Sequence, residues 1–195
     1  MDPDPLAARD GVGDDLPPHC SLMEVHVGEL KQLFNSLDPT PFHQRDLDPN
    51  AEAFIVGWAR ELHEDRPLAL LVHLDREATG DGVAVLKDAV RVFFEQRALA
   101  TRQKLRQLLR NGRTSLVIGL AFLAASIVGG NLIAGLLGES RFGGVIRESL
   151  LIGGWVAMWR PLEVFLYDWW PIRGEARLFD RLSTMSVRIA QRHAP

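Results

Sequence analysis

The chain has 195 residues, of which 47% are hydrophobic and 24% are charged, and its formal net charge is −3. This charge gives no support for nucleic-acid binding, and the single cysteine, Cys20, excludes an intramolecular disulfide. The average composition conceals a separation into polar and apolar segments, which appear in the following order along the chain.

Residues 1–22 are rich in Asp, Pro and Gly and contain few large apolar side chains. We expect them to form a disordered acidic tail, because such a segment buries too little apolar surface to offset its conformational entropy. They also lack the apolar stretch of a signal peptide, so the N-terminal part of the chain is predicted to stay in the cytoplasm.

Residues 23–95 predict a small cytoplasmic α/β domain. Residues 23–27 alternate apolar and polar side chains, and residues 67–75 form an apolar run, so both segments are typical of strands. A helix between them would give a parallel strand–helix–strand unit. Because two strands make a poor independent sheet, we expect the domain to pack against a second copy or another strand, which predicts a homo-oligomer.

The helices of this domain are predicted from apolar residues at helical spacing. One helix is expected over residues 28–37, and a second begins after Asp48 or Asn50 with Pro49 in its first turn. A third begins near Asp81. Since no proline interrupts residues 83–137, we expect one continuous helix of ~80 Å.

Residues 96–114 form a basic juxtamembrane segment interleaved with leucines. Basic side chains near an anionic membrane surface contribute about 1 kcal/mol each to binding. The alternative is that the cluster only fixes the membrane topology, and both roles are compatible. The candidate contacts with anionic lipid head groups are Arg102, Lys104, Arg106, Arg110 and Arg113.

Residues 115–170 predict a transmembrane hairpin. Residues 115–137 carry no charge, and a second apolar segment runs from about 147 to 168; a helix of ~20 apolar residues crosses the ~30 Å hydrocarbon layer. Basic residues are concentrated before and after the hairpin, which predicts that both termini are cytoplasmic and that residues 171–195 form a cytoplasmic amphipathic tail. A single span followed by an interfacial helix is the alternative topology.

Charged residues within the second apolar segment are the main candidate site. Arg160 and Glu163 are three residues apart, so they share a helix face beside Pro161. Inside a membrane such a pair indicates an ion path, a proton path or a lipid head-group clamp. The alternative is that the pair lies among head groups, as the neighbouring Trp159 and Tyr167 suggest.

Small residues recur at four-residue spacing in both apolar segments and allow close packing of helices in lipid. They serve either to pack the two spans together or to form oligomer contacts. The three series are Ala121, Ala125 and Gly129; Ser126, Gly130 and Ala134; and Gly153 and Ala157.

The sequence predicts no cofactor and no metal site. His26 and His73 lie in the two predicted strands and would approach each other if these pair, but two histidines without a recognised third ligand are weak evidence for zinc. His43 lies in a loop with acidic neighbours, where it is a candidate for proton transfer. The sequence contains no nucleotide-binding, zinc-protease or serine-hydrolase motif, which argues against an enzyme.

The segments LFNSLDPTPFHQRDLD (33–48), WRPLE (159–163) and YDWWP (167–171) resemble a family of uncharacterised bacterial membrane proteins. The resemblance implies a bacterial inner-membrane location and implies no activity, ligand or site residue. The sequence as a whole predicts an α+β membrane protein, in which a cytoplasmic module on a two-helix anchor serves as a non-enzymatic scaffold or sensor. The alternatives are a small oligomeric channel or transporter subunit and a membrane-tethered enzyme that uses the 38–48 loop.

Overall fold

The computed structural model describes residues 12–35, 46–63, 65–75, 81–137 and 141–191. The chain divides into two compact units. The α/β unit comprises Met1–Ala100 and Glu175–Pro195, and the helical unit comprises Thr101–Gly174. The structure is therefore mixed α and β, as predicted, with a small sheet and two long apolar helices.

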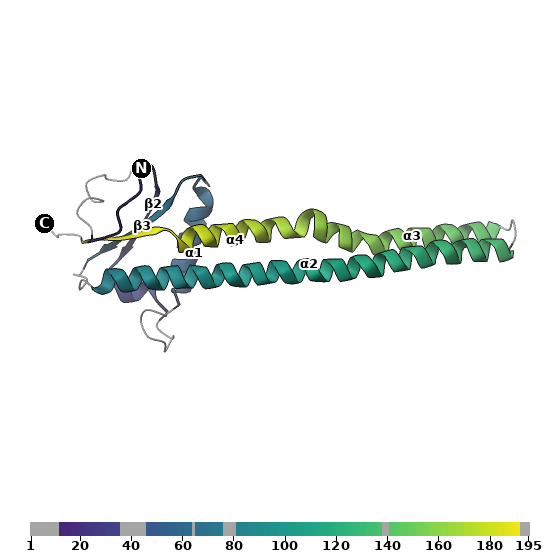
Figure 1. Cartoon of the computed structure of the whole chain (residues 1–195), viewed down its shortest axis with the longest axis horizontal. Helices are drawn as coiled ribbons and strands as arrows, with labels where there is room; N and C mark the ends of the chain where they lie inside the picture. Colours follow the sequence, from purple (N-terminus) through teal and green to yellow (C-terminus); the bar gives the residue numbers. More distant parts are fainter. Residues whose placement is uncertain (1–11, 36–45, 64, 76–80, 138–140, 192–195) are drawn as a thin grey trace. The chain divides into compact units, whose positions relative to one another are not determined.

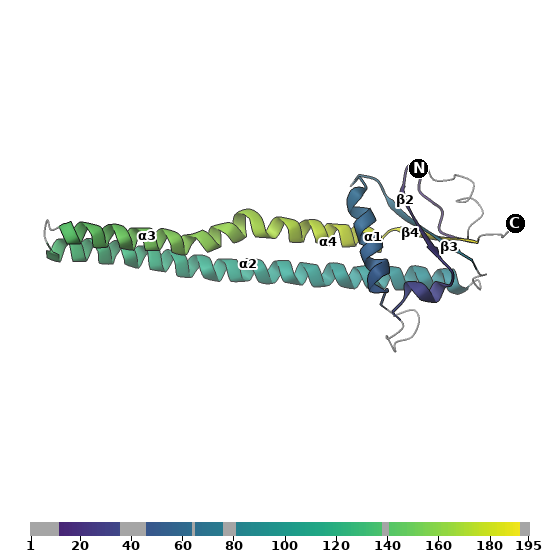
Figure 2. The same ribbon diagram turned by 180° about the vertical axis from the view of Figure 1, so that it is seen from behind.

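The α/β unit is built on a four-stranded sheet with the strand order β1-β4-β3-β2 (Figures 1 and 2). The predicted parallel pair is confirmed, because β2 (Ser21–Val27) pairs in parallel with β3 (Leu68–Leu74). The other edge of β3 pairs in parallel with β4 (Ser186–Gln191). A short strand β1 (Val12–Gly13) lies antiparallel to β4 and ends the sheet.

The C-terminal segment 171–195, predicted as an amphipathic tail, is described over residues 171–191 and is helical only in the first part of that range. Helix α4 (Trp169–Ser183) ends where the hydroxyls of Ser183 and Thr184 donate hydrogen bonds to the carbonyl of Asp180, at 2.8 and 3.2 Å. Strand β4 follows. The chain thus supplies its own third and fourth strands, so the two-strand argument for a homo-oligomer no longer applies.

The N-terminal prediction of a disordered tail over residues 1–22 is wrong for its described part. Val12 and Gly13 pair with Ile189 and Arg188, and Ser21 already belongs to β2. The side chain of Asp14 adds an ion pair with Lys87 at 2.7 Å. Backbone pairing with β4 orders this polar stretch, although the stretch itself contributes little to the core. Residues 1–11 lie outside the described part of the chain.

The connection between β2 and β3 contains one of its two predicted helices. Helix α1 (Pro49–Glu61) begins as expected, with the Asp48 carboxylate accepting a hydrogen bond from the Asn50 amide at 2.9 Å. Of the helix predicted over residues 28–37, the described part, residues 28–35, contains only a single 3-10 turn, η1 (Leu30–Leu33). It stops there because Phe34 becomes extended and pairs with Leu47.

The core of the α/β unit lies between one face of the sheet and helices α1, α2 and α4. Phe94 of α2 (Asp81–Leu137) is fully buried and packs against Phe93 and Phe179, with ring centroids 5.2 and 6.2 Å apart. Phe179 belongs to α4, so residues from both sides of the apolar hairpin complete the same core. The predicted domain 23–95 therefore also requires residues near the C-terminus.

The helical unit contains the second part of α2 and helix α3 (Arg141–Glu163). The expectation of one uninterrupted helix through residue 137 is confirmed. Helix α3 continues into a π-helical turn, η3 (Val164–Asp168), and then into α4. The turn follows Pro161, whose missing backbone N–H interrupts the regular helical hydrogen bonds and favours such a local change of register.

Helices α2 and α3 pack antiparallel through small residues. A Cβ atom built on Gly119, Gly130 or Gly154 would lie within 3.4 Å of an atom of the facing helix. On α2, the buried residues Gly112, Gly119 and Ser126 recur every seven positions, which is the repeat of a left-handed helix pair. Of the predicted series, Ser126 and Gly130 face the partner helix, whereas Gly129 and Gly153 have no heavy atom within 4 Å of such a Cβ.

Candidate functional site

A cluster of three potential metal ligands lies on the face of the sheet opposite the core. The register pairs His26 of β2 directly with His73 of β3. Glu24 precedes His26 by two residues, and side chains two apart in a strand share a face. The two strands therefore place Glu24, His26 and His73 together without any loop.

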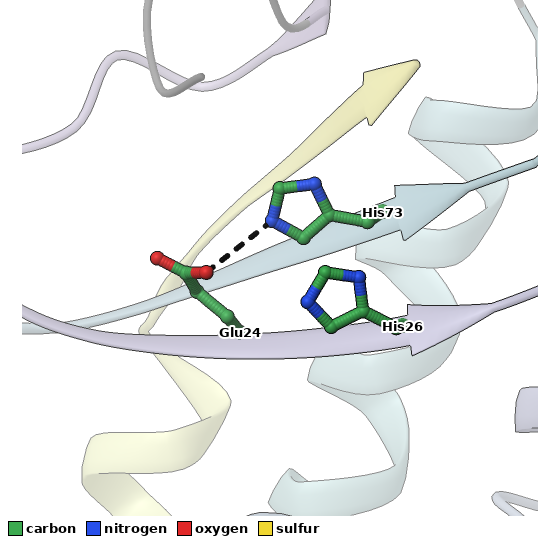
Figure 3. Close-up of side chains that lie close together, drawn as sticks. All are labelled: Glu24, His26 and His73. Atoms are coloured by element: carbon green, nitrogen blue, oxygen red, sulfur yellow. Dashed lines mark ion pairs between the residues drawn. The ribbon is translucent and has the colours of Figure 1, made fainter. Parts of the chain in front are cut away.

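The two imidazole rings stack at a centroid distance of 4.3 Å and an interplanar angle of 9°. Nε2 of His73 lies 3.5 Å from Oε2 of Glu24. One ligand atom from each of the three residues falls within 4.8 Å of the other two. Figure 3 shows a ring nitrogen of each histidine on the side of the Glu24 carboxylate.

The cluster lies on paired strands above the core and is partly open to solvent. The side chains of His73 and Glu24 are 13% and 27% exposed, and His26 is exposed. Beneath them, Met23 and Val72 point to the other face and are fully buried in the core. Arg188 of β4 occupies the same face as the cluster, in the row of the sheet that contains Glu24 and Leu71.

The sequence predicted the approach of His26 and His73 and overlooked Glu24. The signal was available, because residues 23–27 alternate in polarity and an acid two positions before a histidine must then lie beside it. The other candidate, His43, lies outside the described residues, as does most of the 38–48 loop.

Arg160 and Glu163 form the predicted pair at the C-terminal end of α3. Their guanidinium and carboxylate groups are 2.8 Å apart, and Asp168 adds a second carboxylate 3.5 Å from Arg160. Asp168 comes from the π-helical turn, and sequence spacing did not connect it with Arg160. The side chains of Arg160 and Glu163 are 64% and 41% exposed, so the pair does not lie inside the packed helices.

The five candidate lipid-contacting residues before the apolar part of α2 are exposed. Arg102, Lys104, Arg106, Arg110 and Arg113 all have exposed side chains. Arg97 is different: it pairs with Glu52 of α1 at 2.6 Å and lies over the ring of Phe93, so it belongs to the α/β unit.

Comparisons of this chain with protein-family models, with curated proteins and with solved structures find no match. The resemblance to bacterial membrane proteins therefore stays a prediction.

Proposed function

We propose that this chain is an integral protein of a bacterial inner membrane, in which a transmembrane hairpin anchors a cytoplasmic α/β domain that acts as a non-enzymatic sensor or scaffold. The main support for this proposal is the exposure of large apolar side chains along α2 and α3. Those exposed by 63–88% include Val117, Ile118, Leu132 and Leu136 on α2 and Ile152, Trp155 and Val156 on α3.

Exposed apolar surface of this extent argues for a lipid environment. Two helices are long and apolar enough to cross a membrane, and only 17% of the most apolar window of each is buried. A core helix of a soluble protein would be mostly buried, and soluble monomers seldom expose contiguous apolar patches beyond about 600 Å². In a membrane the exposed apolar side chains of both helices would contact lipid hydrocarbon and not water, so their exposure would carry no free-energy cost.

The sheet provides independent support for the hairpin topology. Strand β4 follows the apolar segments and pairs with β3, which precedes them. This pairing supports a topology in which β3 and β4 lie on the same side of a membrane that α2 crosses, with α3 crossing back. It therefore favours the hairpin over the alternative of one span followed by an interfacial helix.

The charge distribution favours the cytoplasmic side for the domain. Six Lys and Arg residues lie between Arg97 and Arg113, and five arginines follow residue 170, against Arg141 and Arg147 near the opposite end of the hairpin. Basic residues are retained on the cytoplasmic side of bacterial membranes. The exposed cluster from Arg102 to Arg113 is then placed to contact anionic head groups.

A sensing or scaffolding role is supported by the shared core of the α/β domain. Helix α2 runs without interruption from that core into the apolar segment, and α4 returns to the same core at Phe179. A ligand or partner that shifts the packing of the domain therefore acts on both helices that leave it. Shifts of packed helices commonly relay a binding event from one part of a protein to another.

Reporter fusions test the topology. Alkaline phosphatase should be active when inserted between α2 and α3 and inactive at the C-terminus, and green fluorescent protein should show the opposite pattern. The protein should also remain in the membrane pellet after alkaline carbonate extraction. Extraction into the supernatant, or an active C-terminal phosphatase fusion, would overturn the proposal.

The channel alternative has its own test. Purified protein in liposomes should give no more ion flux than empty liposomes, and Arg160→Ala should leave the flux unchanged. Flux through the wild-type protein that Arg160→Ala or Glu163→Ala abolishes would replace the anchor proposal with the channel.

A further inference from the structure

We propose that Glu24, His26 and His73 form a binding site for a divalent transition-metal ion, with Zn²⁺ as the best match. This inference concerns the α/β domain alone and does not depend on whether the hairpin crosses a membrane. Within the described residues, these three side chains form the group of His, Cys, Asp and Glu whose donor atoms converge closely enough for a metal.

The donor set selects the class of metal. Two imidazoles and one carboxylate are suited to zinc, copper or nickel, whereas magnesium and calcium prefer oxygen ligands alone. Zinc accepts two histidines and a glutamate as three of four tetrahedral ligands and keeps the fourth position for water. The exposure of His26 leaves solvent access for that water.

The distances between the donor atoms are close to those that a bound zinc ion requires. Zinc–ligand bonds of about 2.0–2.2 Å at tetrahedral angles place two ligand atoms about 3.4 Å apart. Nε2 of His73 and Oε2 of Glu24 are already 3.5 Å apart, and the remaining donor pairs are within 4.8 Å. The stacked rings must rotate about their side-chain bonds so that their nitrogen lone pairs converge, while the strands stay in place.

The paired strands preorganise the site. The parallel register holds His26 beside His73 through backbone hydrogen bonds, and the buried β3 cannot shift without disturbing the core. The competing interpretation is a structural ion pair between His73 and Glu24. That interpretation assigns no role to His26, which stacks on His73 yet remains exposed, so His26 is the residue that distinguishes the two.

The test is zinc binding by the full chain in detergent micelles, purified with an affinity tag that contains no histidine. Competition against a chromophoric chelator should give one zinc per chain. His26→Ala, which alters an exposed side chain, should weaken binding at least about tenfold, and Glu24→Gln should do the same. His63→Ala is the matched control, because it removes an exposed histidine outside the cluster and should leave the affinity unchanged.

Two further measurements distinguish a variant that has lost zinc ligation from one that has lost its fold. Zinc should raise the thermal midpoint of the wild-type chain and of His63→Ala, and should not raise that of His26→Ala. X-ray absorption of the zinc-loaded protein should show nitrogen and oxygen ligands at about 2.0–2.2 Å. Absence of saturable binding, or equal affinity of wild-type and His26→Ala, would overturn the site and leave the topology experiments unaffected.

Discussion

The packing of α2 against α3 predicts sharply different effects at two adjacent glycines. A Cβ atom at Gly154 would lie 2.6 Å from Cδ1 and 3.3 Å from Cα of Leu123, whereas a Cβ atom at Gly153 would have no heavy atom within 4 Å. Carbon atoms pack at about 3.5–4.0 Å. The Leu123 side chain can rotate away, but its Cα moves only if the two helices separate.

Gly154→Leu should therefore destabilise the chain by about 1–3 kcal/mol, the usual cost of overpacking. For a chain of this size, that corresponds to a fall of roughly 3–10 °C in the thermal midpoint. The measurement is thermal unfolding in detergent, followed by tryptophan fluorescence. Gly153→Leu makes the same chemical change on the open side of α3 and should leave the midpoint unchanged or slightly raised.

Equal midpoints for the two variants, or a lower midpoint for Gly153→Leu, would refute the close packing of Gly154 against Leu123. Cross-linking gives an independent check in a Cys20→Ser background. A Cβ atom at Gly154 would lie 3.5 Å from Cβ of Ser126, within disulfide range. Ser126→Cys with Gly154→Cys should thus form an intramolecular disulfide on mild oxidation, and Ser126→Cys with Gly153→Cys should not.

Three substitutions test the α/β unit by thermal unfolding of the full chain. Gly13→Ala should destabilise it by about 1–3 kcal/mol, because Gly13 has a φ of 144° and a Cβ atom there would lie 2.6 Å from the Val187 carbonyl oxygen; an unchanged midpoint would argue against the β1–β4 pairing. Gly57→Ala, in a helix with open space around it, should stabilise by about 0.4–1 kcal/mol, and a loss would contradict the observed exposure. Phe94→Ala should cost about 3–5 kcal/mol through the cavity left beside Phe179, and a cost below about 1 kcal/mol would refute the shared core.

Local sequence patterns predicted the elements whose structure depends mainly on residues close together in the sequence. The apolar run of β3, the alternation in β2 and the Asp48–Pro49 start of α1 depend on neighbours in the sequence, and each is found in the structure. The long α2 follows from the same logic, because helical hydrogen bonds join residues four apart and no proline interrupts them.

The role of β4 required the tertiary structure. Its residues follow a strongly amphipathic helix, and their alternating pattern is short and includes Arg188. The segment becomes a strand because one edge of β3 is available and because Val187 and Ile189 complete the core. No local sequence pattern indicates that an edge of β3 is available for pairing. The prediction for the C-terminal tail and the predicted number of strands were therefore wrong.

For the candidate metal site, too, the sequence determined one part of the arrangement and the tertiary structure determined the other. The alternation of β2 was sufficient to place Glu24 and His26 on one face, but only the register of β2 with β3 brings His73 beside them. A shift by one residue would move His73 to a different row and away from His26.

The apolar hairpin shows the same division between sequence and tertiary structure. Composition alone determined that residues 115–137 and the second apolar segment are long and apolar enough to cross a membrane. It did not determine that Gly154, and not Gly153, faces Leu123. Successive residues differ by about 100° around a helix axis, so one position decides whether a side chain meets the partner helix or open space, and that rotation is set only when the two helices pack.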